Sequence, residues 1–177
     1  LILKLIGGAG ALVTPSITEG ELRMLINIAG AEGSVEMSEA EMLASVFRFG
    51  DRQVREMMTP RTEIIFIERG TQMGEFLKVY AENAHTRFPV YKGSTDDVIG
   101  ILSAKDVLRA MSASEMTSDD PVTTIIRDVY FVPETKRIAE LFDELRGSGN
   151  QIAIAIDEFG GIAGLVTLKR LLEEVVG

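Results

Sequence analysis

Hydrophobic positions along this chain fall into blocks that occur twice at a nearly constant spacing. In the segment 73–80, apolar residues stand at the first, fourth, fifth and eighth positions, which places them on one face of a helix. The segment 138–145 repeats this pattern 65 positions later (138 − 73). The two segments therefore predict equivalent amphipathic helices in a duplicated unit.

The duplication extends to both sides of these helices. β-prone runs precede them at 64–67 and 129–132, and further strand-like runs follow at 88–91 and 152–155. Each copy then ends with a short apolar run, a hydroxyl residue and a helical pattern, at 100–108 and 164–172. Each copy is thus predicted to fold as strand, helix, strand, strand, helix. Repeats of this size are whole supersecondary units that cover one another's apolar faces.

Two further helices are predicted before the duplicated unit, after a loosely ordered lead-in at 1–17. Thr18-x-x-Glu21 and Ser38-x-x-Glu41 have the form of capping boxes, each ahead of a helical pattern. The pattern predicts that these helices bury seven apolar residues: Leu22, Leu25, Ile26, Ala29, Met42, Val46 and Phe49. We expect them to connect or brace the duplicated core.

Charge and composition exclude several function classes. The formal net charge of −9 argues against nucleic acid as a partner, because phosphate backbones require concentrated Lys and Arg. The chain has no cysteine and one histidine, so thiolate metal sites are excluded and a histidine-based metal cluster or catalytic triad is not expected. No run approaches the roughly 20 apolar residues of a membrane-spanning helix. Because it does not begin with Met, we expect the chain to be part of a longer protein.

Ordered motifs connect the duplicated unit to a known family. Gly-h-h-[Ser/Thr] (h, apolar) stands at the final strand–helix junction of both copies, and Asp follows three residues after Ser103 in the first copy. Two β-α-β-β-α copies with this junction resemble a tandem pair of CBS domains, the Bateman module. Residues 51–63, 85–90 and 156–168 resemble the module of CorC/HlyC and CNNM-type membrane proteins more narrowly. The resemblance implies an α+β fold with a helical linker at 1–50, one CBS domain at 51–112 and a second at 113–177.

The resemblance also implies a function. Such proteins carry a transmembrane domain before the CBS pair, which lies at the cytoplasmic face of the plasma (inner) membrane, and they are associated with transport of Mg²⁺ and other divalent cations. The CBS pair is a regulatory part that binds adenine nucleotides, AMP or ATP, with or without Mg²⁺, and usually forms a homodimer through its helices. Its partners would be a second copy and the transmembrane domain of its own full-length protein.

A first nucleotide site is expected at the junction of the first copy. The start of a helix offers free N–H groups to phosphate, Ser103 can donate to a phosphate or ribose oxygen, and Asp106 can accept from ribose hydroxyls. The family geometry adds the first strand of the other copy, where Thr124 and Ile125 would wall the adenine; Gln151 belongs to the same predicted set. The alternative is that Ser103-x-x-Asp106 merely caps the helix, which would stabilise it by ~1 kcal/mol.

A second site would combine Thr167 with Thr59, His85 and Arg87. Here Arg170 stands where Asp106 stands in the first copy, and a guanidinium cannot accept hydrogen bonds from ribose. This site is therefore either lost or biased towards longer phosphate chains, and we expect the Asp106 site to bind adenosine better. His85 and Arg87 have plain alternatives, as a solvated histidine and a surface salt-bridge residue.

Three functional classes remain for comparison. The chain is predicted to be a non-catalytic regulatory module that binds adenine nucleotides and controls an attached transporter. A structural dimerisation module with vestigial ligand sites is the alternative. An enzyme acting on nucleotides is not supported, because the sequence shows no plausible nucleophile–base pair, and neither catalytic nor metal-ligating residues are assigned.

Overall fold

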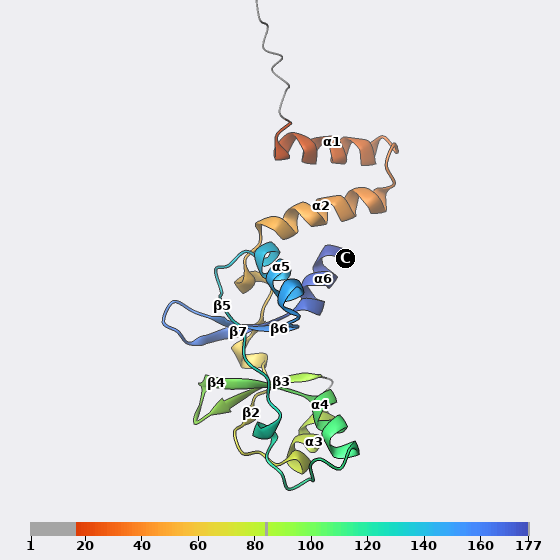
Figure 1. The fold of residues 1–177 in the computed structure, drawn as a ribbon. Coiled ribbons are helices and arrows are strands. Elements are labelled where there is room, and N and C mark those ends of the chain that lie inside the picture. Colours follow the sequence, from red (N-terminus) through yellow and green to blue (C-terminus); the bar gives the residue numbers. More distant parts are fainter. Residues whose placement is uncertain (1–16, 84, 177) are drawn as a thin grey trace, which may run out of the picture. The chain divides into compact units, whose positions relative to one another are not determined.

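The computed structural model describes residues 17–83 and 85–176, with side chains up to residue 174, and the chain divides into two compact units at residues 47 and 48. The predicted lead-in lies outside the described residues, apart from Ile17. The first unit contains helix α1 (Glu19–Ala31) and most of helix α2 (Met37–Asp51). The second unit contains both repeats (Figure 1).

The first unit is a helical hairpin whose two helices approach closely at Gly30. The capping box of Thr18 and Glu21 is confirmed at the start of α1. The second predicted capping box is wrong, because Ser38 already lies inside α2. Gly30 is buried against Ala40, and a Cβ at position 30 would stand 2.9 Å from the Ala40 Cβ. The two helices therefore meet where their side chains are smallest.

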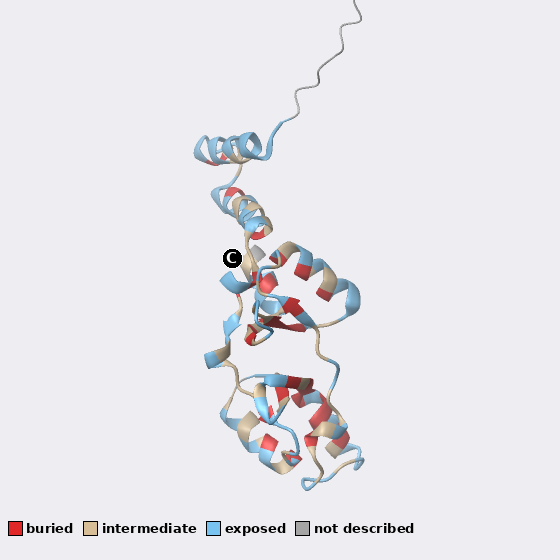
Figure 2. Ribbon diagram, turned by 90° about the vertical axis from the view of Figure 1, so that its left-hand side faces the viewer, coloured by how far each residue is buried: buried red, intermediate tan, exposed pale blue. Residues whose placement is uncertain are grey.

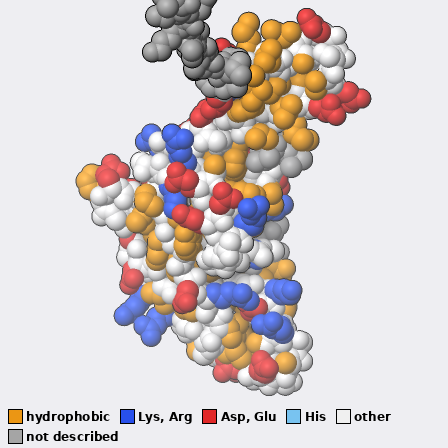
Figure 3. Space-filling model, turned by 45° about the horizontal axis from the view of Figure 1, so that its top comes forward, with side chains coloured by type: hydrophobic (Ala, Val, Ile, Leu, Met, Phe, Trp, Pro, Cys, Tyr) orange, Lys and Arg blue, Asp and Glu red, His pale blue; other side chains and the backbone are white. Residues whose placement is uncertain are grey.

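Burial in this hairpin is lower than the sequence pattern predicts. The predicted core positions Leu22, Leu25, Met42 and Val46 are 41–52% exposed, and Figure 3 shows hydrophobic side chains on the surface of the helical hairpin. The prediction is confirmed for Phe49, which is buried and belongs to the second unit. Two helices can cover only one stripe of each other, so the remaining apolar positions find no cover within this unit.

The two repeats have the predicted element order, with additional 3₁₀ turns. Repeat 1 contains η1 (Val54–Glu56), β1 (Thr59–Pro60), η2 (Arg61–Glu63), β2 (Ile67–Glu68), α3 (Met73–Glu82), β3 (Arg87–Lys92), β4 (Ser94–Ser103) and α4 (Ala104–Ser112). Repeat 2 contains η3 (Val122–Thr124), β5 (Phe131–Pro133), α5 (Ile138–Ser148), β6 (Ile152–Ile156), β7 (Ile162–Thr167) and α6 (Leu168–Val176). The predicted strands at 64–67 and 129–132 are shorter and begin later, at Ile67 and Phe131.

Each repeat forms a sheet covered by its own two helices. In repeat 1 the strand order is β2-β3-β4, and in repeat 2 β5, β6 and β7 pair in the same way, with β1 of repeat 1 added at the edge beside β7. One buried cluster lies between α3, α4 and the first sheet, and another between α5, α6 and the second (Figure 2). A third cluster joins Val98 and Ile101 of β4 to Ile152, Ile154 and Ile162, so the two sheets face each other across a shared apolar layer.

The repeats also exchange their leading segments, which we define as residues 53–60 and 121–128. Thr59 pairs with Leu165 of β7, while Arg127 pairs with Ile101 of β4 through two backbone hydrogen bonds of 2.9 Å. Each crossing needs a glycine. A Cβ on Gly164 would lie 2.6 Å from the Thr59 carbonyl oxygen, and a Cβ on Gly100 would lie 2.5–2.9 Å from Ile126. This exchange places each leading segment beside the other repeat's last strand.

Candidate functional site

Two cavities lie between the repeats, one beside each strand–helix junction. The larger cavity has a volume of about 710 Å³ and lies beside the β7–α6 junction; the smaller cavity has about 220 Å³ and lies beside the β4–α4 junction. The larger is lined by Thr59, Glu63, Ile64, Ile65, His85, Thr86, Arg87, Pro89, Gln151, Ile152, Leu165, Thr167, Leu168, Lys169, Arg170, Leu172 and Glu173. The smaller is lined by Arg87, Ile101, Ser103, Lys105, Asp106, Arg109, Arg127, Asp128, Gly149, Asn150, Gln151 and Ile152.

The larger cavity brings together all four residues predicted for the second site. Thr59 comes from β1, His85 from the loop before β3, Arg87 from the start of β3, and Thr167 from the end of β7. Gln151, which was predicted for the first site, lines both cavities and accepts a hydrogen bond from Arg87. The volume is within the range of about 300–1,000 Å³ that is typical of small-molecule pockets.

The lining of the larger cavity has an apolar part and a cationic part. Seven side chains supply the apolar part: Ile64, Ile65, Pro89, Ile152, Leu165, Leu168 and Leu172. The first turn of α6 adds Lys169 and Arg170, and Arg87 adds a third positive charge. Because the N-terminus of a helix favours anions, the charged groups and the helix dipole here act in the same direction.

The hydroxyl of Thr167 stabilises this helix start. The backbone N–H of Arg170 donates to Thr167 Oγ1 at 3.1 Å, and the N–H of Leu168 donates to the Gln151 carbonyl at 3.0 Å. The Arg170 side chain is exposed and has no acceptor for ribose hydroxyls. The carboxylates in this lining are Glu63 and Glu173, which the sequence analysis did not assign; Glu173 also forms an ion pair with Lys169 at 3.3 Å.

The smaller cavity contains the predicted pair Ser103 and Asp106, but its carboxylate already has two partners. Asp106 Oδ2 accepts from Nε of Arg127 at 2.7 Å and lies 2.7 Å from its Nη2, while Oδ1 accepts from Arg109 at 3.1 Å. The Asp106 side chain is only 9% exposed. Both carboxylate oxygens are thus occupied by guanidinium groups of the same chain.

The capping alternative for Ser103 and Asp106 does not describe this junction. Ser103 stands at the N-cap of α4, yet its side chain makes no capping hydrogen bond. The Asp106 carboxylate turns to the two arginines and not back to the helix start. The capping contact is found instead in repeat 2, at Thr167.

Thr124 and Ile125, which were predicted to wall the adenine, are outside the linings of these two cavities. Thr124 closes the turn η3 and donates to the Pro121 carbonyl, and Ile125 packs against the repeat 1 core. The residues of this segment that line the smaller cavity are Arg127 and Asp128.

A change of spacing between the repeats explains why Arg127 and Asp128 line this cavity in place of Thr124 and Ile125. Buried Val54 corresponds to buried Val122 at an offset of 68 (122 − 54), whereas Met73 and Ile138 at the starts of α3 and α5 are 65 apart (138 − 73). The additional three residues of repeat 1 are accounted for by the turn η2, which has no counterpart in repeat 2. Alignment of Val54 with Val122 would have placed Arg127 opposite Thr59.

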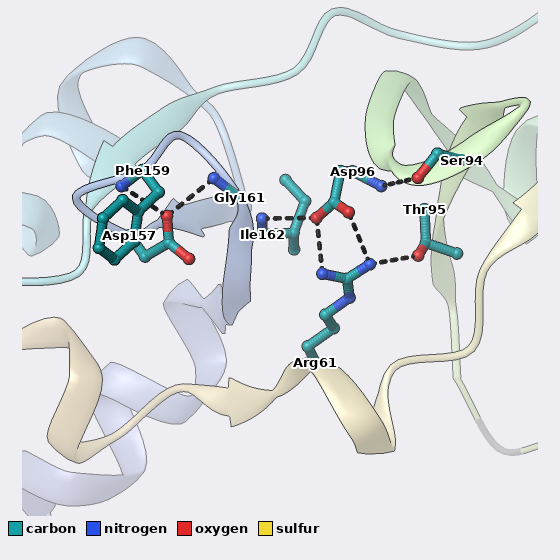
Figure 4. Close-up of polar contacts among 8 residues, drawn as sticks. All are labelled: Arg61, Ser94, Thr95, Asp96, Asp157, Phe159, Gly161 and Ile162. Carbon is teal, nitrogen blue, oxygen red and sulfur yellow. Dashed lines mark hydrogen bonds and ion pairs between the residues drawn. The ribbon is translucent and has the colours of Figure 1, made fainter.

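The turn η2 is held by a polar cluster that connects the repeats (Figure 4). Arg61 pairs with both carboxylate oxygens of Asp96 at 2.6 and 2.8 Å and donates to Thr95 at 2.7 Å. The N–H of Ile162 donates to the same carboxylate at 3.1 Å, and this bond, followed by that of Arg61, lowers the pKa of Asp96. The predicted hairpin turn at 157–161 is confirmed beside it, where Asp157 accepts from the N–H groups of Phe159 and Gly161. The cluster fixes the turn that carries Glu63 into the larger cavity.

The comparison with known families agrees with this architecture. The sequence pattern of the CBS domain matches residues 54–113 and 118–177. The chain belongs to the CBS domain family. Its two repeats are a tandem pair of CBS domains, as the sequence analysis predicted.

Curated relatives of this CBS pair include membrane-transport proteins. The chain is 40% identical over 158 residues to the magnesium and cobalt efflux protein CorC of Escherichia coli K12, covering 89% of the chain and 53% of that protein. It is 35% identical over 171 residues to a UPF0053 protein of Mycobacterium tuberculosis, covering 96% of the chain and 39% of that protein. The chain thus spans about half the length of these relatives, or less.

Solved structures of similar CBS pairs include ligand complexes. The CBS domain of the bacterial CNNM/CorC family Mg²⁺ transporter, in complex with an inhibitor, superimposes with a TM-score of 0.83 at 39% identity, covering 90% of this chain and 98% of that one. A complex of that domain with ATP gives 0.74 at 41% identity and covers 78% and 97%. A CBS-domain pair from Klebsiella pneumoniae with bound AMP gives 0.61 at 28% identity and covers 71% and 98%.

Membrane-spanning helices and clustered metal ligands are both absent from residues 17–83 and 85–176. No helix there combines sufficient length with the apolar composition of a membrane span. The same residues contain no group of three or more His, Asp or Glu side chains placed to hold a metal ion.

Proposed function

We propose that this CBS pair binds an adenine nucleotide in the larger cavity and that the bound nucleotide regulates an attached membrane transporter. The observation that carries the proposal is the composition of this cavity. Its lining combines apolar side chains from three strands, from the segment after η2 and from α6 with three cationic residues, Lys169 and Arg170 in the first turn of α6 and Arg87 on β3. An adenine ring requires the first environment and phosphate requires the second.

Ribose requires acceptors, and two carboxylates are available for it. Arg170 has replaced the aspartate that would accept from ribose at this junction, but Glu63 projects from η2 into the same lining. Glu63 is exposed, whereas Glu173 is engaged by Lys169. We therefore assign the ribose hydroxyls to Glu63. Thr59, His85, Arg87, Gln151 and Thr167 keep the ligand-binding roles predicted for them.

The related CBS structures support this choice of ligand class. One contains ATP and another contains AMP. These ligands belong to those proteins, and the cavity described above is the reason to transfer the ligand class to this chain. Mg²⁺ would accompany ATP as part of the ligand, in the form in which nucleoside triphosphates are usually bound.

Regulation would operate through shape and without chemistry on the nucleotide. A ligand can shift a conformational equilibrium only if it binds the alternative states with different affinities. Because the larger cavity is built from both repeats, a nucleotide that contacts both would favour one arrangement of the repeats over another. The transporter would be the membrane part of the full-length protein, with this module at the cytoplasmic face of the membrane and divalent cations of the Mg²⁺ or Co²⁺ type as its cargo.

Calorimetric titration of the chain with AMP, ADP and ATP tests the proposal. We expect saturable binding that weakens about tenfold in Arg170→Ala, because hydrogen bonds to charged groups contribute roughly 1.5–3 kcal/mol. Arg146→Ala is the matched control, since Arg146 lies on α5, pairs with Asp143 and lines neither cavity. Absence of binding by all three nucleotides would refute the proposal, and turnover of ATP would point to an enzyme instead.

A structural dimerisation module is the second candidate, and exposed leucines favour it. Leu108 on α4 and Leu172 on α6 are 47% and 45% exposed. A homodimer through these helices is compatible with nucleotide binding and is expected in either case. Sedimentation that shows a monomer at high concentration would contradict it. If no adenine nucleotide raises the melting temperature, dimerisation alone remains.

A further inference from the structure

The two cavities share one wall. Arg87, Gln151 and Ile152 line both of them, and Arg87 donates to the side-chain oxygen of Gln151 across this wall. A phosphate oxygen is a stronger acceptor for a guanidinium than a neutral amide oxygen. A phosphate chain that leaves the larger cavity can therefore draw Arg87 from Gln151 and continue towards the smaller cavity.

The smaller cavity is cationic although the whole chain has a formal net charge of −9. Its lining contains four cationic side chains, Arg87, Lys105, Arg109 and Arg127, against the two carboxylates of Asp106 and Asp128. The balance of the ionisable lining is thus positive by two charges (4 − 2). An anion is the ligand class that this balance favours.

Asp106 acts here as a positioning residue for arginines. Its carboxylate takes three N–H groups from Arg127 and Arg109, while the two arginine side chains remain 65% and 70% exposed. Because each guanidinium has five N–H donors, most of these donors stay available to another anion. The carboxylate itself has little remaining capacity to accept from ribose. The volume of about 220 Å³ is also below the range for a whole small-molecule ligand.

Ser103 adds a hydroxyl donor to the cationic lining. It is buried, with 9% of its surface exposed, and it lines the smaller cavity at the first turn of α4. Within the described residues, its hydroxyl makes no hydrogen bond to a capping partner or to another side chain. This hydroxyl can donate to an acceptor such as a phosphate oxygen.

We propose that the smaller cavity binds the terminal phosphates of a nucleoside triphosphate whose adenosine end lies in the larger cavity. Ser103, Lys105, Arg109 and Arg127 bind the phosphates, Asp106 orients the two arginines, and Arg87 binds the phosphate chain where the cavities meet. The inference rests on the proposed function, because it requires adenosine in the larger cavity. It makes the module selective for ATP over AMP and gives one nucleotide per chain.

Titration of the whole chain with AMP and ATP, with and without Mg²⁺, tests the inference in Arg127→Gln and Lys105→Gln. Each variant should weaken ATP about tenfold, the contribution of one hydrogen bond between charged groups, and should change AMP by less than about twofold. The partners of the Asp106 carboxylate are Arg127 and Arg109 and not Lys105, so the Lys105 variant tests the cavity without breaking the arginine cluster. Arg146→Gln on α5 is the control, because it removes an arginine that pairs with an aspartate, Asp143, outside both cavities.

The outcomes separate this inference from the proposed function. If neither nucleotide binds, the proposed function fails and the inference fails with it. If both bind, the inference is overturned by any of three results: equal affinities for AMP and ATP, equal losses for both nucleotides in the variants, or two ATP molecules per wild-type chain. Folding is checked by the melting temperature of each unliganded variant.

Discussion

The two cavities are built from equivalent elements, yet their volumes differ about threefold and their linings contain different residues. Each combines a strand–helix junction with the leading segment of the other repeat. In the larger cavity that segment contributes Thr59, followed by the turn η2 and by Ile64 and Ile65. In the smaller cavity it contributes Arg127, whose guanidinium pairs with Asp106. A duplicated fold can thus offer two different environments from one architecture.

The difference begins with three residues. In repeat 1, which contains η2, Ile67 of β2 follows the crossing residue Thr59 by eight positions (67 − 59). In repeat 2, the equivalent residue Val132 of β5 follows the crossing residue Arg127 by five positions (132 − 127). The longer segment of repeat 1 contributes Glu63, Ile64 and Ile65 to the lining of the larger cavity. The shorter segment of repeat 2 runs directly from the crossing to β5. A local insertion has therefore changed the chemistry of one cleft without changing either sheet.

The largest expected effect is on stability, when either glycine at which a leading segment crosses to the other repeat, Gly164 or Gly100, is replaced by alanine. In Gly164→Ala the new Cβ meets backbone, the Thr59 carbonyl oxygen at 2.6 Å, so we expect a loss of about 3 kcal/mol in the free energy of unfolding. Gly100→Ala meets Ile126, whose Cδ1 and Cγ1 can rotate away although its Cβ, at 2.9 Å, moves only with the backbone, so it should cost less, about 1–2 kcal/mol. Denaturant unfolding measures both.

A third alanine variant is the control for these two. Gly147 lies in α5 with no atom within 4 Å of an added Cβ, so Gly147→Ala should leave stability unchanged or raise it by up to about 1 kcal/mol. Equal costs for Gly164→Ala and Gly100→Ala would show that the backbone crossing in repeat 1 is no tighter than the side-chain crossing in repeat 2.

The sequence was sufficient to predict the repeat and its main elements because they depend on local periodicity. The apolar spacing at 73–80 and 138–145 defines α3 and α5 directly, and the runs at 88–91 and 152–155 lie within β3 and β6. The burial of α1 could not be predicted in this way. Periodicity shows which face of a helix is apolar, but it does not show whether another element covers that face.

The site was predictable only in part, because it depends on which residues cross between repeats. Thr59 and Thr124 share an identity and an offset of 65 (124 − 59), which made them look equivalent, whereas the crossing follows an offset of 68 (127 − 59). The pairing of Arg127 with Asp106 joins residues 21 positions apart and arises only after the segments cross. Glu63 was missed for the same reason, since η2 belongs to one repeat alone.

Replacement of Glu63 tests the difference between the cavities through nucleotide affinity, and its expected effect is smaller than that of the glycine variants. If Glu63 accepts from ribose, Glu63→Ala should weaken ATP about tenfold and should weaken 2′,3′-dideoxy-ATP by less than about twofold, because that analogue lacks both hydroxyls. Glu158→Ala on the β6–β7 turn is the control, since Glu158 is an exposed carboxylate outside both cavities. Calorimetry gives all four affinities. Stronger binding of ATP by Glu63→Ala would show that Glu63 repels the phosphates and does not hold ribose.

The smallest effect should come from Asp96, which holds η2 in place. The Ile162 N–H and Arg61 lower the pKa of Asp96 from its ordinary value of 3.8, so the folded state favours the charged carboxylate. The resulting stability is present above the ordinary pKa and is lost as the pH falls through the lower folded value.

Asp96→Asn keeps an acceptor for Ile162 but loses the ion pair with Arg61. Its melting temperature should therefore lie a few degrees or less below that of the wild type at pH 7, and the gap should begin to narrow as the pH falls below about 4. Thermal unfolding between pH 3 and 7 measures the gap, and a constant gap across this range would show that the charge of Asp96 does not stabilise the turn.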